Sequence, residues 1–236
     1  MNNNRLTPAF TPDLTKRESV FGLVWLAVHM FGIPLLLSVL MPVYPEISEL
    51  TANTIYYAVS LIVVMVAFLK LLRREFDHLL DRFLHCVVTF FSGYFLWYAL
   101  AMVMTGIMTA LDIGGTPPND QYIDSMANSG FNLMLVLSVI AAPIVEEVLF
   151  RGVLFQTIRK RSRVWAYVAS LLLFGLYHTW QYAVAYREPM YLLYTLQYIP
   201  ITFALTWSYE RSGSLWVPMA IHATNNYLAM TVMQMM

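Results

Sequence analysis

The sequence predicts an all-α fold, a polytopic membrane bundle of about seven transmembrane helices with its catalytic core in the C-terminal four. Of 236 residues, 59% are hydrophobic and only 12% are charged, whereas soluble domains carry about 25% charged residues. Apolar stretches of roughly 20 residues recur, the length that crosses a hydrocarbon core of about 30 Å. The formal net charge of zero provides no bulk attraction to nucleic acid, so we expect no nucleic-acid partner.

The sequence predicts a polar tail followed by one membrane domain with seven apolar segments. Residues 1–19 are polar, with two prolines, and are expected to form a cytoplasmic N-terminal tail; residues 20–236 are expected to form one integral membrane domain. The third apolar segment is long enough to tilt or to extend beyond the bilayer, and the turn at 212–218 begins the last one. The seven apolar segments lie at about 20–41, 55–72, 83–111, 131–158, 164–184, 190–209 and 214–234.

Charge in the loops predicts the orientation. Basic residues lie before the first segment and in alternate loops after the second, fourth and sixth segments, whereas the other loops carry mainly carboxylates. Only Arg187 breaks this alternation. The positive-inside rule therefore predicts a multi-pass protein of the cell membrane with a cytoplasmic N-terminus and an external C-terminus.

Ionisable side chains lie within three of the predicted spans. Glu146 is in the fourth span, His178 in the fifth, and His222 and Asn226 in the seventh. Such groups are costly in a membrane and usually face the bundle interior or a water-filled cavity. At 1.5 Å per residue, the two imidazoles and the carboxylate lie about 16–22 Å from the basic side, within roughly one helical turn of each other. We therefore expect them to meet around one cavity.

Helical spacing assigns separate roles. Glu147 and Arg151 are four residues apart and share a face, so they are expected to form a structural ion pair. Glu146 is turned about 100° from its neighbour and remains the free carboxylate. Phe174 shares a face with His178 and is expected to pack beneath its ring. Asn225 is turned away from Asn226 and is left outside the site.

This set suggests hydrolysis without a serine or cysteine nucleophile. Glu146, beside His178, can act as a general base that takes a proton from a water molecule. The activated water is then directed at a peptide carbonyl. His222 and Asn226 can donate hydrogen bonds to the oxyanion, each such donor being worth about 2.7–4 kcal/mol of barrier.

A zinc ion is the alternative. Glu146, His178 and His222 are a possible ligand set, with water in the fourth position. The sequence contains no H-E-x-x-H pair, so we favour a site with no cofactor, while zinc stays open. The single Cys86 excludes an internal disulfide and a Cys-rich metal site.

The chain resembles the CPBP family, the CAAX proteases and bacteriocin-processing enzymes also called the Abi family. Its three motifs occur in order as EEVLFR (146–151), FGLYH (174–178) and HATNN (222–226), and the resemblance covers about 130–232. It implies an intramembrane endopeptidase in which Glu146 and His178 activate water while His222 and Asn226 stabilise the oxyanion. The family has been described both as metalloproteases and as glutamate-dependent proteases.

Three functions follow from these features. The first is an endopeptidase that cleaves a membrane-associated protein or peptide, of CAAX type or resembling a secreted peptide or bacteriocin. The second is a non-enzymatic immunity or partner-binding protein that uses the same buried groups for helix packing. A transporter is the third and is less favoured, because no inverted repeat is evident. His29, alone in the first span, is expected to be a core histidine bonded to a neighbouring helix.

Overall fold

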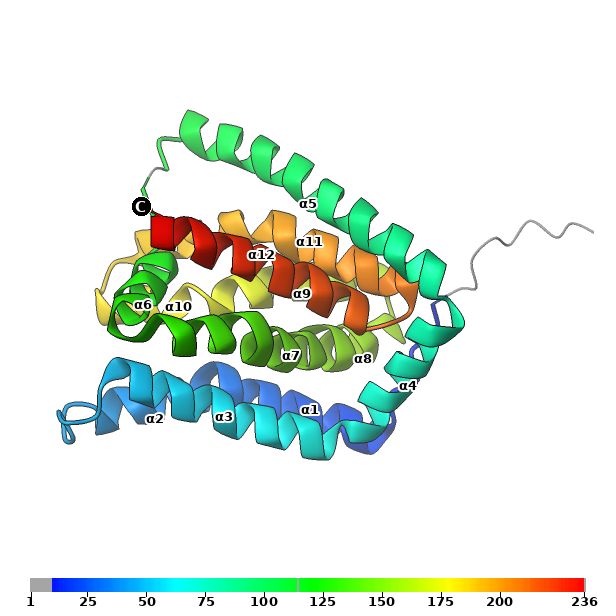
Figure 1. Cartoon of the computed structure of the whole chain (residues 1–236), viewed down its shortest axis with the longest axis horizontal. Helices are drawn as coiled ribbons and strands as arrows, with labels where there is room; N and C mark the ends of the chain where they lie inside the picture. Colours follow the sequence, from blue (N-terminus) through cyan, green and yellow to red (C-terminus); the bar gives the residue numbers. More distant parts are fainter. Residues whose placement is uncertain (1–9, 114, 236) are drawn as a thin grey trace, which may run out of the picture.

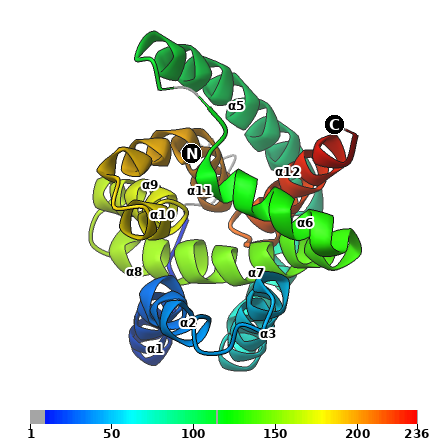
Figure 2. The same ribbon diagram turned by 90° about the vertical axis from the view of Figure 1, so that its left-hand side faces the viewer.

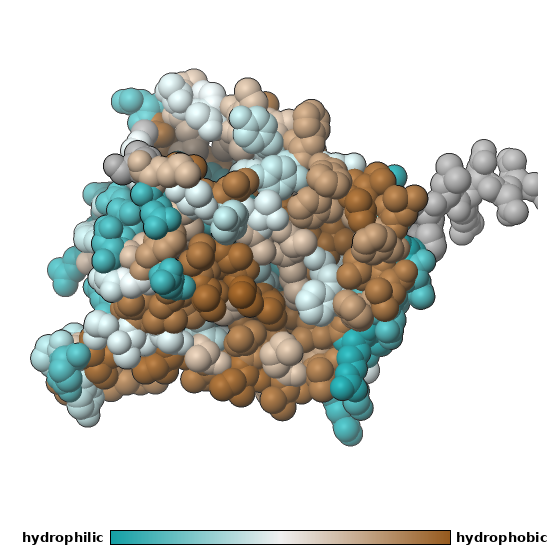
Figure 3. Space-filling model, viewed as in Figure 1, coloured by the Kyte–Doolittle hydropathy of each residue, from teal (hydrophilic) through white to brown (hydrophobic). Residues whose placement is uncertain are grey.

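The structure is a computed structural model that describes residues 10–113 and 115–235, and every regular element in these ranges is a helix (Figure 1). Large apolar side chains cover much of the outer surface, including Val66, Leu84 and Phe95, which are 77%, 75% and 74% exposed. Figure 3 shows such side chains over most of the visible face, with hydrophilic residues gathered towards its two ends. Because an apolar surface this large is unsuited to water, the bundle is a membrane protein.

Two helical arms form one side of the bundle. The first arm is continuous from Lys16 to Leu40, and α3 returns beside it before α4 crosses the end of the bundle (Figure 1). The N-terminal elements are α1 (Lys16–Ala27), a π-helical turn (Val28–Gly32), α2 (Ile33–Leu40), α3 (Glu49–Ala67), α4 (Leu69–Asp81) and α5 (Phe83–Ala110).

A 42-residue helix, Pro118–Arg159, runs through the middle of the molecule. Figure 2 shows it between the layer of α1–α3 and the layer of α9–α12. All eight residues of Val148–Phe155 are buried, because neighbours cover this stretch on both sides. The central helix consists of α6 (Pro118–Val136), a π-helical turn (Leu137–Ala141), α7 (Ala142–Glu147), a longer π-helical stretch (Val148–Phe155) and α8 (Gln156–Arg159).

The remaining helices complete the second layer. Helix α11 packs against both α5 and α9. The elements are α9 (Arg163–Tyr177), α10 (Trp180–Ala185), a 3₁₀ turn (Pro189–Tyr194), α11 (Thr195–Ser212) and α12 (Trp216–Met235).

The predicted all-α membrane bundle is confirmed, whereas the count of seven spans stays a prediction. Four helices in the described residues are long and apolar enough to cross a membrane. They are Lys16–Leu40, Glu49–Ala67, Phe83–Ala110 and Pro118–Arg159.

The expected fifth segment, 164–184, ends earlier than predicted. Helix α9 stops at Tyr177, and His178 caps it. The His178 N–H donates to the Gly175 carbonyl at 3.2 Å, and the Thr179 hydroxyl donates to the same carbonyl at 3.1 Å. A side chain that bonds a carbonyl of the last turn competes with continuation of the helix. The sixth segment accordingly begins its α-helix at Thr195, later than the predicted 190.

Part of the expected N-terminal tail, residues 10–15, lies on the bundle. Residues 1–9 lie outside the described ranges, but the next residues lie against the bundle. The Phe10 ring contacts the Tyr209 ring at 5.0 Å between centroids. The side-chain oxygen of Gln156 accepts hydrogen bonds from the Asp13 and Leu14 N–H groups at 3.0 and 3.2 Å. This segment is therefore anchored to the central helix before α1 begins.

Glu75 links α4 to α11 and to the turn before α12. Its carboxylate is 2% exposed and accepts hydrogen bonds from the Tyr209 hydroxyl and the Leu215 N–H, both at 2.9 Å. Burial raises the pKa of Glu75 to about 8, and these two hydrogen bonds act in the opposite direction. Both donors are needed because a buried carboxylate without partners is strongly disfavoured.

Candidate active site

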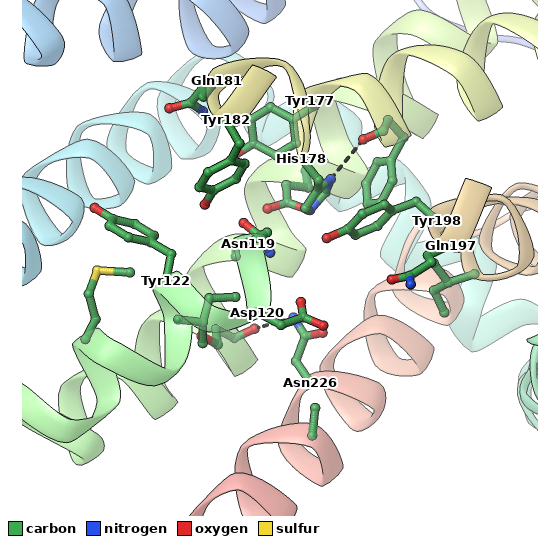
Figure 4. A pocket seen from close by; sticks show the side chains of 18 of the residues that line it. Asn119, Asp120, Tyr122, Tyr177, His178, Gln181, Tyr182, Gln197, Tyr198 and Asn226 are labelled. Atoms are coloured by element: carbon green, nitrogen blue, oxygen red, sulfur yellow. Dashed lines mark hydrogen bonds and ion pairs between the residues drawn. The ribbon is translucent and has the colours of Figure 1, made fainter. Parts of the chain in front are cut away.

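The four predicted catalytic side chains line one cavity of about 1070 Å³ (Figure 4). Glu146 comes from the central helix, His178 from the end of α9, and His222 and Asn226 from α12. Helices α3, α5, α6 and α11 supply further walls. The structure therefore brings together the groups that the sequence placed at a common depth.

Glu146 faces both imidazoles through the same oxygen. Its Oε2 atom lies 3.9 Å from His178 Nε2 and 3.8 Å from His222 Nε2. The side chain is buried, and Oε2 has no hydrogen-bond partner among the described residues. These distances are too long for a direct hydrogen bond. An oxygen atom could lie about 2.8 Å from Glu146 Oε2 and about 2.8 Å from the Nε2 atom of either histidine. The gap is suited to a water molecule.

Backbone contact fixes the orientation of His178. Its Nδ1 lies 2.8 Å from the Phe174 carbonyl oxygen, one turn earlier in α9. Because a carbonyl only accepts hydrogen bonds, Nδ1 carries the proton and neutral Nε2 presents its lone pair towards Glu146. The ring is stacked on Tyr198 at 4.4 Å and contacts the Phe174 ring at 4.8 Å between centroids. Phe174 thus packs against His178 as the spacing indicated.

Glu147 and Arg151 form the ion pair that their spacing predicts, and they also hold His222. Arg151 Nη1 donates to Glu147 Oε1 at 3.0 Å, and both side chains have no exposed surface. The same oxygen lies 2.8 Å from His222 Nδ1. Arg151 also lies over the Phe174 ring, 4.5 Å from its centroid. This cluster fixes the imidazole that points at Glu146.

Asn226 has a structural bond as well as a place at the cavity wall. Its Nδ2 donates to the Ser138 carbonyl at 2.8 Å. Ser138 lies in a π-helical turn, where an N–H group bonds to the carbonyl five residues earlier. The residue five positions after Ser138 is Pro143, which has no N–H to donate. Asn226 therefore satisfies a carbonyl that the proline leaves free. One N–H of its amide remains for a ligand.

Asn225, which the spacing places outside the site, also lines the cavity. Its Nδ2 donates to Asn226 Oδ1 at 3.3 Å. The expectation for Asn225 was wrong because a wide cavity admits side chains that differ by 100° around α12. Its contact orients the neighbouring amide.

A tyrosine network behind Glu146 was missed by the sequence reasoning. The Tyr57 hydroxyl donates to Glu146 Oε1 at 3.0 Å and lies 3.2 Å from the Tyr177 hydroxyl. The Tyr56 hydroxyl lies 3.0 Å from that of Tyr177 and 2.9 Å from His29 Nε2. With fifteen tyrosines in the chain, no spacing distinguished these three.

His29 completes this network. Its Nδ1 lies 2.9 Å from the Ser60 hydroxyl on α3, which confirms the expected bond to a neighbouring helix. The first two arms of the bundle therefore support the free carboxylate from the side opposite the imidazoles. This gives the N-terminal helices a role in holding Glu146 that the motifs did not indicate.

The possible zinc ligands converge without forming a metal-binding arrangement. Among the residues that the structure describes, no group of three His, Cys, Asp or Glu side chains is placed to hold a metal ion. Glu146, His178 and His222 instead surround the gap of 3.8–3.9 Å described above.

This helical membrane bundle holds a buried carboxylate opposite two imidazoles at the wall of a cavity. Residues 128–228 match the family model described as type II CAAX prenyl endopeptidase Rce1-like, and this region contains all three motifs. In this region the chain is similar to the CPBP family of intramembrane proteases.

One curated relative is similar to this chain over much of its length. The Bacillus subtilis (strain 168) protein named "Putative membrane peptidase YdiL" is 25% identical over 188 residues, which cover 75% of this chain and 70% of that protein. No solved structure matches the chain.

Proposed function

We propose that the chain is an endopeptidase that hydrolyses a peptide bond in a membrane-associated protein or peptide, using a water activated by Glu146. The observation that carries the proposal is the convergence of His178 Nε2 and His222 Nε2 on one unpartnered oxygen of Glu146. A water in that gap reaches the carboxylate and either ring nitrogen. The adjoining cavity of about 1070 Å³ has room for a peptide segment.

The proposed reaction begins with the water. Glu146 Oε2 takes one proton from it, and His178 Nε2 accepts its second hydrogen as a hydrogen bond, so that the oxygen is aimed at the carbonyl carbon. The new C–O bond forms as the carbonyl π electrons move to its oxygen. The protonated Glu146 then gives its proton to the amide nitrogen as the C–N bond breaks. The products are a carboxylic acid and an amine.

His222 and Asn226 are proposed as donors to the oxyanion. In this proposal His222 Nδ1 donates to Glu147. When the ring carries a proton on each nitrogen, Nε2 is a second donor and can reach the oxyanion. The ring lies between two carboxylates, with Nε2 at 3.8 Å from Glu146 Oε2 and Nδ1 at 2.8 Å from Glu147 Oε1. Asn226 contributes the amide N–H that the Ser138 carbonyl does not use. Donors held in place before the reaction cost no reorganisation when charge develops.

The proposal requires no metal. The gap beside Glu146 has the size for a hydrogen-bonded water, and the ligand spacing lacks the paired imidazoles of an H-E-x-x-H helix. We further propose that the basic end of the bundle, around α4 and the α8–α9 junction, faces the cytoplasm. This gives a cytoplasmic N-terminus and, if the three remaining apolar segments also cross, an external C-terminus.

Proteolysis is tested by comparing terminal peptides in membranes from cells that make the wild-type chain or His178→Ala. We expect new protein termini in the wild-type membranes that disappear in the variant, because the substitution removes the water-orienting nitrogen. Both chains must accumulate to the same level. Identical termini, with any cellular phenotype retained by the variant, would instead support a non-enzymatic immunity or partner-binding protein.

A further inference from the structure

The two ends of the bundle carry opposite charge. The end formed by α4 and by the α8–α9 and α11–α12 junctions holds most of the basic side chains, whereas the opposite end has six carboxylates and one cation, Arg187, among the described residues. The six carboxylates are Glu46, Glu49, Asp112, Asp120, Asp124 and Glu188.

The catalytic cavity extends towards the acidic end. Its wall reaches Glu49 at the start of α3, Ile113 after α5 and Tyr186 after α10. No described lining residue belongs to the basic end. A substrate segment therefore reaches Glu146 through the acid-bearing part of the molecule.

The charge on the cavity wall is one-sided. Three described lining residues are carboxylates, namely Glu49, Asp120 and Glu146, and none is lysine or arginine. Asp120 lies in the first turn of α6 and is half-buried. Figure 4 shows Asp120 at the same cavity as His178 and Tyr198, whose rings are stacked. Asp120 is therefore close enough to the reacting groups to affect a bound peptide.

We infer that the cavity selects peptide segments with a lysine or arginine within about four residues of the cleaved bond, and that Asp120 is the specificity-determining residue. This inference rests on the proposed function. A cation there gains attraction from Asp120 in a site of low dielectric constant. A glutamate, or a free C-terminal carboxylate at the same place, meets repulsion, and no lysine or arginine among the described lining residues offsets it.

Aromatic side chains add to the same preference. Tyr122, Tyr182, Tyr186 and Tyr198 line the acid-bearing part of the cavity (Figure 4 labels all but Tyr186). The face of an aromatic ring attracts a cation, and the attraction increases when water is excluded. Nothing comparable on this wall favours an anion.

The test uses purified protein in lipid nanodiscs and internally quenched peptides of mixed sequence, with Lys, Gln or Glu fixed at one position at a time. We expect a ratio of kcat/KM for Lys over Glu peptides of at least about tenfold, with cleavage sites located by mass spectrometry. Asp120→Asn should reduce the ratio to about threefold or less, and Asp120→Lys should reverse it. Asp124→Asn is the matched control, because Asp124 is exposed one turn later in α6 and does not line the cavity; its ratio should be unchanged.

The outcomes separate this inference from the proposed function. Cleavage with no preference between Lys and Glu, or a preference that Asp120→Asn leaves intact, would overturn the role of Asp120 while leaving the protease in place. Failure of the wild-type chain to cleave any peptide, including those matching termini that depend on His178 in cells, would overturn the proposed function itself. The wild-type ratio alone is decisive if an Asp120 variant does not fold.

Discussion

Glu146→Gln is expected to lower kcat for peptide cleavage by about 10³-fold in purified protein. The substitution removes the carboxylate oxygen that faces both imidazoles, and a positioned general base typically contributes about 10²–10⁴-fold. The amide has nearly the same shape, and its oxygen can still accept the Tyr57 hydrogen bond. We therefore expect the thermal unfolding midpoint to stay within a few degrees of the wild-type value.

The matched control is Glu46→Gln, an identical change at an exposed carboxylate that does not line the cavity. Its kcat should equal that of the wild type. If Glu146→Gln retained more than about a third of wild-type activity, the carboxylate would not be the base, and the reaction would have to be assigned to another group.

Arg151→Met is expected to destabilise the fold by about 3–5 kcal/mol, the usual cost of removing one partner from a buried ion pair. Arg151 and Glu147 have no exposed surface, and Glu147 also holds His222 at 2.8 Å. Methionine leaves the carboxylate without its cation and leaves the face of Phe174 without a guanidinium. The measurement is the free energy of unfolding in mixed micelles with increasing denaturing detergent.

The double variant Glu147→Leu with Arg151→Met separates charge from packing. Because it leaves no unpaired charge in the core, it should recover at least half of the lost stability, although His222 loses its partner and cleavage should remain weak. If Arg151→Met were within 1 kcal/mol of the wild type, the ion pair would not be a structural element of the fold.

The main features of the site could be predicted because they depend on simple geometry. Rise per residue placed Glu146, His178 and His222 at one depth, and helical spacing paired Glu147 with Arg151. A second bond on a paired residue is harder to foresee. The contact of His222 with Glu147 depends on how α12 lies against the central helix, which periodicity within one segment does not contain.

Other features depend on local backbone or on shape. The π-helical turn before Pro143 directs the Ser138 carbonyl to Asn226, and no motif spacing indicates such a turn. The helix break after Tyr177 is a local backbone feature, in which the N–H groups of His178 and Thr179 bond carbonyls three residues earlier. Tyr57 and Tyr177 became recognisable only when the arms and the central helix were in place, because tyrosines in an apolar segment equally suit packing or an interface.

Direct attack of an activated water on the peptide carbonyl is the central step of the proposed reaction. A single turnover in H₂¹⁸O tests this step. With enzyme in excess over a cleavable peptide, we expect one heavy oxygen in the new C-terminal carboxylate of the product and none in the protein peptide that contains Glu146. Heavy oxygen incorporated into Glu146, or a covalent adduct trapped on that residue, would show that the carboxylate attacks the substrate itself and would contradict its role as the base.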